Sequence, residues 1–228
     1  MARSTSSPWG ISLPPERERL HDDHGNWSHE RKAGSQMRIG RGVLVTVIGA
    51  SGAGKDTLID HAREVLESKP GFLFVRRCIT RPAQDGGEAH DSMSEMDFLE
   101  LESAGGFAVT WTAHGLHYGV PASARRHVHE GGIAVLNGSR KALPAIAAAF
   151  PGMLAVEIVA SRQTRAHRLA TRGRESASEI LARLDREVPD AFRTDVARTI
   201  SNDGSVAEAG KELADWLSEL ASLPEVSS

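Results

Sequence analysis

Seven residues near position 50 have the types and the spacing that bind phosphate. The stretch 49–55 reads Gly-Ala-Ser-Gly-Ala-Gly-Lys and matches the pattern GxxxxGK. It follows an apolar, β-branched run and precedes an amphipathic stretch, which is the strand, loop and helix order of a phosphate-binding loop. Glycines let successive backbone N–H groups turn toward one anion, and the start of the helix adds positive charge. The pattern predicts that the donor phosphates of ATP are held by Gly49, Ala50, Ser51, Gly52, Ala53, Gly54 and Lys55.

The position after the lysine departs from the usual loop. Serine or threonine normally ligates magnesium there, whereas this chain has Asp56 followed by Thr57. Magnesium prefers hard oxygen ligands, and an unpaired carboxylate beside a triphosphate would repel it unless a cation intervened. The alternative is that Asp56 only stabilises the positive end of its helix. We expect Asp56 to hold magnesium, and Thr57, about 100° further round the helix, to be the weaker candidate.

Arginines supply the material for a second anion site opposite the loop, because their planar forks grip phosphate through two hydrogen bonds. Arg81 follows a predicted strand, and open α/β sheets bind ligands at the carboxyl ends of their strands. We therefore expect Arg81 to bind the second substrate, which would accept a phosphoryl group from ATP. Segment 161–175 carries five more arginines around Gly173. This pattern predicts a helical lid that closes on the transferred phosphoryl group. The alternative is a charged, solvated helix pair. These arginines are Arg162, Arg165, Arg168, Arg172 and Arg174.

The elements that must position these groups follow from the apolar pattern. From Val43 onward, short β-branched runs alternate with amphipathic stretches, which predicts βα units, a mostly parallel sheet and no second domain boundary. We expect strands at 43–48, 72–79, 107–113, 133–136, 154–159 and 199–201. We expect turns at 115–119 and helices at 56–68, 94–103, from Pro121, and at 140–150, 161–171, 176–187 and 205–220.

The N-terminal segment differs in composition from the rest of the chain. Only 8 of the first 36 residues are apolar, prolines interrupt them, and five basic residues balance five acidic ones. We expect a flexible extension at 1–38, a folded domain with the phosphate loop at 39–222 and a flexible terminus at 223–228. The histidines and aspartates at 21–29 are interpreted as a solvated tract rather than a metal site, and Met37 is an alternative translation start.

Charge and composition exclude several other classes of function. The net charge is -3, from 27 basic and 30 acidic residues, so no global positive field predicts binding to nucleic acid or to an anionic membrane. Cys78 is the one cysteine, which excludes an internal disulfide framework and a multi-cysteine zinc site. The sequence has neither an apolar run long enough to span a bilayer nor the apolar segment of a secretion signal. We expect a cytoplasmic protein.

Residues 42 to about 220 resemble the guanylate-kinase-like branch of the nucleoside monophosphate kinases, and within it the family of ribose 1,5-bisphosphate phosphokinases. Six segments carry this resemblance together. They are Gly-Ala-Ser-Gly-Ala-Gly-Lys-Asp at 49–56, Ile-Thr-Arg at 79–81, Gly-Leu-His-Tyr-Gly-Val at 115–120, Asn-Gly-Ser-Arg at 137–140, Arg-Gly-Arg-Glu-Ser-Ala-Ser-Glu-Ile at 172–180 and Asn-Asp-Gly-Ser at 202–205.

The resemblance implies a fold, a reaction and a set of site residues. The fold is the α/β three-layer fold of P-loop nucleoside monophosphate kinases, with a mostly parallel central sheet and a helical lid. The reaction is transfer of the γ-phosphoryl group of ATP, with Mg²⁺, to the 1-phosphate of ribose 1,5-bisphosphate; this yields 5-phosphoribosyl 1-diphosphate (PRPP) in phosphonate catabolism. The acceptor residues would be Arg81, Tyr118, Asn137, Ser139 and Arg140, the lid clamp Arg168, Arg172 and Arg174, and the residues near adenine Asn202 and Asp203.

Departures from guanylate kinases bear on the alternatives. Val120 follows Tyr118-Gly119, at a position where guanylate kinases have a hydroxyl side chain that binds guanine. Segment 80–84 lacks the second arginine of guanylate kinases, and segment 108–110 lacks their acidic residue; those groups bind the phosphate and the base of the nucleotide. These differences count against a nucleoside monophosphate acceptor, which stays the first alternative. The second is a non-catalytic binding module, although such modules typically lose the phosphate loop. A GTPase is disfavoured because Asn-Lys-x-Asp is missing. The oligomeric state stays open, a homodimer included.

Overall fold

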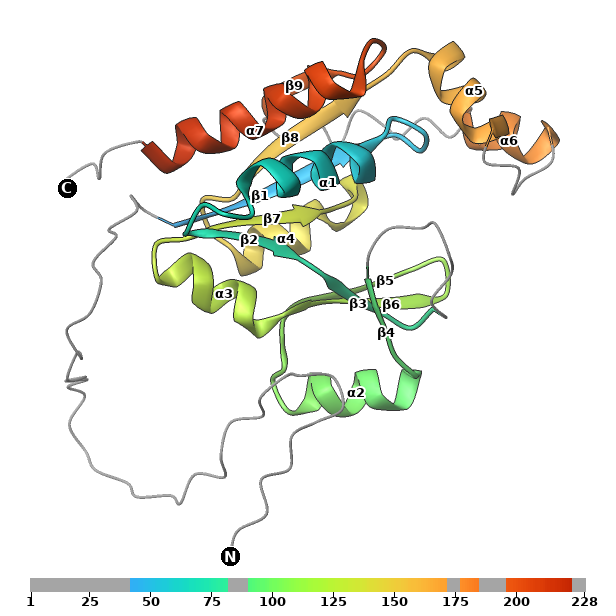
Figure 1. Cartoon of the computed structure of the whole chain (residues 1–228). Helices are drawn as coiled ribbons and strands as arrows, with labels where there is room; N and C mark the ends of the chain where they lie inside the picture. The colour runs from blue at the N-terminus through green and yellow to red at the C-terminus, as the bar shows by residue number, and fades with distance from the viewer. Residues whose placement is uncertain (1–41, 82–89, 172–176, 185–195, 223–228) are drawn as a thin grey trace, which may run out of the picture. The chain divides into compact units, whose positions relative to one another are not determined.

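A computed structural model describes residues 42–81, 90–171, 177–184 and 196–222, all of which belong to the unit Arg38–Ser228. Their strands form two sheets (Figure 1). The central sheet has five strands in the order β2-β7-β1-β8-β9, and the second sheet has four in the order β4-β3-β6-β5. The predicted domain limits at 1–38 and 223–228 lie outside the described residues and stay predictions.

Every described pair in the central sheet is parallel, which confirms the predicted sheet. β1 lies in the middle and pairs with a strand along each edge, and five of its residues are buried. Because all five strands run the same way, their carboxyl ends share one edge, and the phosphate loop follows β1 at that edge. The strands are β1 (Val43–Gly49), β2 (Phe72–Val75), β7 (Ile133–Asn137), β8 (Leu154–Val159) and β9 (Val196–Ser201).

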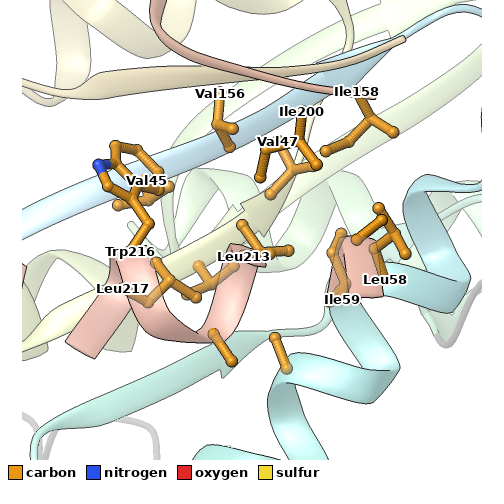
Figure 2. Packing of buried hydrophobic residues seen from close by; sticks show 14 of the residues in the cluster. Val45, Val47, Leu58, Ile59, Val156, Ile158, Ile200, Leu213, Trp216 and Leu217 are labelled. Atoms are coloured by element: carbon orange, nitrogen blue, oxygen red, sulfur yellow. The ribbon is translucent and has the colours of Figure 1, made fainter. Parts of the chain in front are cut away.

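Helices cover both faces of the central sheet. α1 (Lys55–Leu66) and α7 (Val206–Ser222) lie on one face, where Leu58 and Leu213 pack against Val47 (Figure 2). α3 (Ala122–His129) and α4 (Leu143–Ala149) contribute to a second apolar cluster, which takes Leu44 from the other face of β1. The alternation of side chains along β1 therefore determines the face of the sheet on which α1 packs, directly after the phosphate loop.

The second sheet was not predicted. Residues 72–79 read as one strand, but this prediction is wrong, because the chain leaves β2 at Val75 and enters β3 in the other sheet at Arg77. Residues 115–119 were predicted to be a turn, which holds for Gly115 but is wrong for residues 116–119, since these lie in β6 and pair with β5. The bends at His114 and Gly115, both at positive φ, connect these two strands. The sheet consists of β3 (Arg77–Ile79), β4 (His90–Ser92), β5 (Phe107–Ala113) and β6 (Leu116–Pro121).

The remaining helices agree with the sequence apart from their ends. α2 (Glu95–Ser103) is capped as expected, because Ser94 Oγ accepts a hydrogen bond from the Asp97 backbone at 3.1 Å. The predicted 140–150 helix divides into η1 (Arg140–Ala142) and α4. α5 (Arg162–Thr171) and α6 (Ala177–Leu184) are the two helices of the predicted lid segment, and they pack through Leu169, Ile180 and Leu184. No described helix is both long and apolar enough to cross a membrane.

Candidate active site

The phosphate loop adopts backbone angles that require its glycines. Gly52 and Gly54 have φ angles of 80° and 92°, in the left-handed region that L residues disfavour. Gly54 is also the N-cap of α1, so the first free N–H groups of that helix face the space above the loop. A side chain at Gly54 would collide with Asn202, because an added Cβ would lie 2.3 Å from Asn202 Nδ2. The loop is therefore packed closely against Asn202 at Gly54.

Lys55 lies across the loop that precedes it. Its Nζ donates hydrogen bonds to the backbone oxygens of Gly49 at 3.0 Å and Ala50 at 3.3 Å. These contacts hold the ammonium group at the carboxyl end of β1, beside the N–H groups of the loop. A flexible stem lets this ammonium group turn from the two carbonyl oxygens to a phosphate.

Asp56 is joined to the end of a neighbouring strand. Asn137, the last residue of β7, donates a hydrogen bond from Nδ2 to Asp56 Oδ1 at 2.6 Å. Asn137 is only 8% exposed, so the amide end of this bond is shielded from water. The carboxylate stands in the first turn of α1, directly after Lys55, and its hard oxygens fit Mg²⁺. Asn137 was predicted to bind the acceptor, and the structure places it against the predicted magnesium ligand.

Two side chains from beyond β8 converge on the loop. Asn202 follows β9, is 1% exposed, and donates from Nδ2 to the Ala53 backbone oxygen at 2.8 Å. Arg168 of α5 donates to the same oxygen at 3.3 Å and to Asn202 Oδ1 at 3.5 Å. The structure thus brings one predicted lid arginine to the loop. Arg172 and Arg174 lie outside the described residues.

A pocket of about 350 Å³ opens beside these contacts. Its position at the first turn of α1 and its mixed polar and apolar walls suit the base and sugar of a nucleotide whose phosphates occupy the loop. Thr57 faces this pocket rather than Asn137, as its place on the helix predicted. The lining residues are Gly54, Thr57, His167, Arg168, Thr171, Asn202 and Val206.

Asp203 is the N-terminal anchor of α5. Its carboxylate accepts hydrogen bonds from the Ser161 backbone N–H at 2.8 Å and from the Thr164 hydroxyl at 2.6 Å. The Thr164 hydrogen bond, followed by those from Ser161, lowers the pKa of Asp203. Asp203 is not among the residues that line the pocket, so its proximity to adenine stays a prediction, whereas its contacts orient the helix that carries Arg168.

The acceptor candidates come from two places in the fold. Tyr118 pairs in register with Ile79, which brings it to the end of β3 that precedes Arg81. The Nε atom of Arg81 is buried and has no hydrogen-bond partner among the described residues. An arginine that is left with an unsatisfied donor is suited to an anionic ligand.

Ser139 and Arg140 follow β7 and already have protein partners. Ser139 Oγ accepts a hydrogen bond from the Ala142 backbone at 3.3 Å and caps η1. The Arg140 guanidinium forms an ion pair with Glu157 of β8. Glu157 therefore offsets the charge that Arg140 would offer to an acceptor phosphate, and the acceptor role of both residues stays a prediction.

Curated relatives match almost the whole described unit. Ribose 1,5-bisphosphate phosphokinase PhnN of Agrobacterium fabrum is 46% identical over 178 residues, covering 78% of this chain and 97% of the relative. The protein of the same name from Rhizobium etli is 43% identical, covering 82% of this chain and 93% of the relative. The one from Laribacter hongkongensis is 46% identical, but the match spans 45% of its length. The chain belongs to the ribose 1,5-bisphosphate phosphokinase family.

Solved structures confirm the fold class of this phosphokinase family member. Guanylate kinase from Anaplasma phagocytophilum superposes with a TM-score of 0.54 at 17% identity, covering 81% of this chain and 89% of the other. At that identity, the likeness concerns the fold alone. No family model matches the chain. The resemblance inferred from the six motifs is confirmed, and the chain is accordingly a kinase that uses a nucleotide as phosphoryl donor.

Sequence reasoning missed two residues of the second sheet. The Trp111 ring stacks on Tyr118 with centroids 5.5 Å apart and planes 4° from parallel. The buried Arg77 places its guanidinium 5.8 Å and 5.5 Å from these two rings. The signal was present, because Trp111 and Tyr118 stand at equal distances from the His114-Gly115 bend, but that bend was not recognised as a hairpin.

Proposed function

We propose that this chain transfers the γ-phosphoryl group of ATP to the 1-phosphate of ribose 1,5-bisphosphate, giving 5-phosphoribosyl 1-diphosphate and ADP. The observation that carries the proposal is the 46% identity to a ribose 1,5-bisphosphate phosphokinase over 97% of its length. The geometry supports it, because the phosphate loop, the nucleotide-sized pocket and an arginine with a buried, unused Nε donor belong to one unit. The single cysteine favours action in the reducing cytoplasm, and the family resemblance supports a role in phosphonate catabolism.

On the donor side, each residue has a separate task. The N–H groups of the loop and the Lys55 ammonium bind the β- and γ-phosphates, and the pocket beside Asn202 takes the adenosine part. Asp56 would hold magnesium, which neutralises charge on the phosphates when bound. Arg168 stands where its guanidinium can leave the Ala53 oxygen and approach the phosphoryl group as α5 and α6 close and exclude water.

On the acceptor side, the nucleophile needs no general base. An oxygen of the 1-phosphate is already anionic at neutral pH, so it attacks the γ-phosphorus directly. The new bond joins that oxygen to the γ-phosphorus, the bond from the γ-phosphorus to the bridging oxygen breaks, and ADP leaves with the electron pair. Arg81 and Tyr118 are proposed to position the acceptor phosphates, since Tyr118 pairs with Ile79, two residues before Arg81.

A nucleoside monophosphate acceptor is disfavoured by the environment of Val120. This side chain is 0% exposed and belongs to the apolar cluster between the second sheet and α3. Ala108 lies in the same cluster, and Val109 packs against it. A guanine base has polar edges that need hydrogen-bond partners, which these apolar side chains do not supply.

The test is an assay with competing acceptors. Purified protein, ATP and magnesium are incubated with ribose 1,5-bisphosphate, GMP, AMP or no acceptor, and the products are followed by phosphorus NMR. We expect ADP and a diphosphate from ribose 1,5-bisphosphate alone, and neither product with the Lys55→Met variant. Rapid phosphorylation of GMP without that diphosphate would replace the proposal by the nucleoside monophosphate alternative. ATP binding without transfer to any acceptor would favour the binding module.

A further inference from the structure

The bond between Asn137 and Asp56 links the two places from which P-loop enzymes hold their cation. In such enzymes, magnesium is held by the serine or threonine after the loop lysine and by an aspartate outside the loop. Here the residue after Lys55 carries the carboxylate, and the residue outside the loop that touches it is a neutral amide. The number of carboxylates is therefore the same, but the carboxylate and the neutral polar group have exchanged places.

The backbone around Asn137 fixes its distance from the loop. Asn137 pairs in parallel register with Val47 of β1, two residues before Gly49. The next residue, Gly138, donates its backbone N–H to the Val47 oxygen at 2.9 Å, which continues the strand pairing past Asn137. The amide thus projects from a rigid strand, whereas Asp56 lies on the first turn of a helix. Rigid strands are suited to hold a ligand of a cation in place.

The chemistry of the two groups determines which atoms face each other. An ionised carboxylate has only acceptors, so it must receive a hydrogen from the Asn137 amide nitrogen. This bond occupies one carboxylate oxygen of Asp56 and leaves the second oxygen available to a cation. The amide oxygen of Asn137 then faces away from Asp56 and can accept a hydrogen from a water of the magnesium shell, because magnesium usually keeps several waters.

We propose that Asn137 is a positioning residue that holds the Asp56 carboxylate toward the metal on the nucleotide, and that the pair replaces the serine and aspartate of other P-loop kinases. This inference rests on the proposed phosphoryl transfer and concerns how the same site holds its cation. It differs from the sequence interpretation, in which Asn137 bound the acceptor. Groups that orient a metal ligand typically contribute 10- to 100-fold to metal affinity.

The first experiment measures the metal directly. Mn²⁺ binding to the protein with ATP is followed by electron paramagnetic resonance, and ATP binding in EDTA by calorimetry, for the wild type and Asn137→Ala. We expect Mn²⁺ to bind about 10- to 100-fold more weakly to the variant, with ATP affinity in EDTA unchanged. The matched control is Gln163→Ala, which truncates an exposed amide on α5 and should change neither value. Equal Mn²⁺ affinity in a folded Asn137→Ala protein would overturn the proposal.

A charge exchange tests the same pair independently of whether the truncated variant folds. Asp56→Ser alone should lose Mn²⁺ affinity, and the double variant Asp56→Ser/Asn137→Asp should recover it to within about tenfold of the wild type. A double variant no better than Asp56→Ser would overturn the exchange. These measurements need no acceptor, so they stay decisive if ribose 1,5-bisphosphate proves not to be the substrate.

Discussion

Gly54 combines two constraints at a single residue of the phosphate loop. Its φ of 92° disfavours any L residue, and an added Cβ would lie 2.3 Å from Asn202 Nδ2. Gly54→Ala should therefore displace Asn202 from the Ala53 oxygen as well as strain the backbone, which alone costs about 1–2 kcal/mol. We expect ATP affinity to fall at least about tenfold and the melting temperature to fall by several degrees.

Gly152 offers the matched control for this substitution. It also has a positive φ, 80°, but no atom lies within 4 Å of an added Cβ. Gly152→Ala should show the backbone strain without the collision, so ATP affinity should be that of the wild type. Calorimetric titration with ATP distinguishes the two variants, and equal ATP affinities in both would contradict the role of the Gly54 and Asn202 contact.

The Tyr118 hydroxyl is a second residue-scale case, on the acceptor side. Tyr118→Phe removes the hydroxyl and keeps the ring that stacks on Trp111. If the hydroxyl binds an acceptor phosphate, kcat/KM for the acceptor should fall about 10- to 100-fold, the range for a hydrogen bond to a charged group. The dissociation constant for ATP and the melting temperature should stay unchanged. Steady-state kinetics with varied acceptor checks this, and an unchanged kcat/KM would remove Tyr118 from the acceptor site.

At the scale of elements, α5 depends on an anchor from another part of the chain. Asp203 accepts from Ser161 and Thr164 at the start of α5, and four residues after Thr164 the same helix carries Arg168 to the loop. Asp203→Ala should loosen the first turn, so its amides should exchange hydrogen faster and ATP should bind more weakly. The control is Glu208→Ala in the first turn of α7, which should leave exchange in α5 unchanged. Unchanged exchange in Asp203→Ala would contradict the anchoring role.

The pH dependence of this anchor follows from the lowered pKa of Asp203. A carboxylate whose pKa is lower in the folded state stabilises the fold above its unfolded value of 3.8. That contribution is lost only as pH falls through the lowered pKa. The difference in α5 exchange between wild type and Asp203→Ala should therefore be constant around neutral pH.

Element-scale patterns also explain which parts of the fold could be predicted. β1 and β8 were predicted almost to the residue, because buried parallel strands are continuous apolar runs with turn residues at their ends. The passage from β2 to β3 carries no such mark. Arg76 alone separates β2 from β3, and its side chain contacts Asp91, which lies 15 positions later in the sequence. Local pattern does not encode which sheet a strand joins, so the second sheet needed tertiary information.

The candidate site divides in the same way. The loop from Gly49 to Lys55 is a local motif, so spacing alone located it. The contacts of Asn202 with Ala53 and of Asn137 with Asp56 join residues 149 and 81 positions apart. The family resemblance placed both asparagines near the site, but their partners depend on the order of strands in the central sheet. The sequence therefore predicts that both asparagines belong to the site, but not which residues they form hydrogen bonds with.

At the scale of the whole molecule, one apolar cluster joins the two sheets. Ala108 and Val120 of the second sheet pack with Leu136 of the central sheet and with α3 and α4. Because this cluster is shared, the second sheet should not open without disrupting the core, and the described unit should unfold in one step. Cys78, buried in the second sheet beside Phe98, reports on that opening.

Burial, with a smaller effect from the charge of Asp91, raises the pKa of Cys78 to about 12. The folded protein thus keeps a neutral thiol, whereas the unfolded chain releases the proton near the ordinary thiol pKa of 9.0. The unfolded state binds fewer protons between these values, so the free energy of unfolding should fall as pH rises from about 9 toward 12. Cys78→Ala should show a weaker fall over the same range in denaturant titrations.

Labelling of this single thiol tests the cooperativity. At pH 8, a thiol reagent should modify Cys78 no faster than the protein unfolds globally, and magnesium with ATP should slow labelling, because a ligand bound to the central sheet stabilises the entire folded unit. Global unfolding is measured in parallel by denaturant kinetics, and Cys78→Ala gives the background of the reagent. Labelling that is faster than global unfolding and insensitive to ATP would mean that the second sheet opens alone. The shared cluster around Val120 would then be too weak to couple the second sheet to the central sheet.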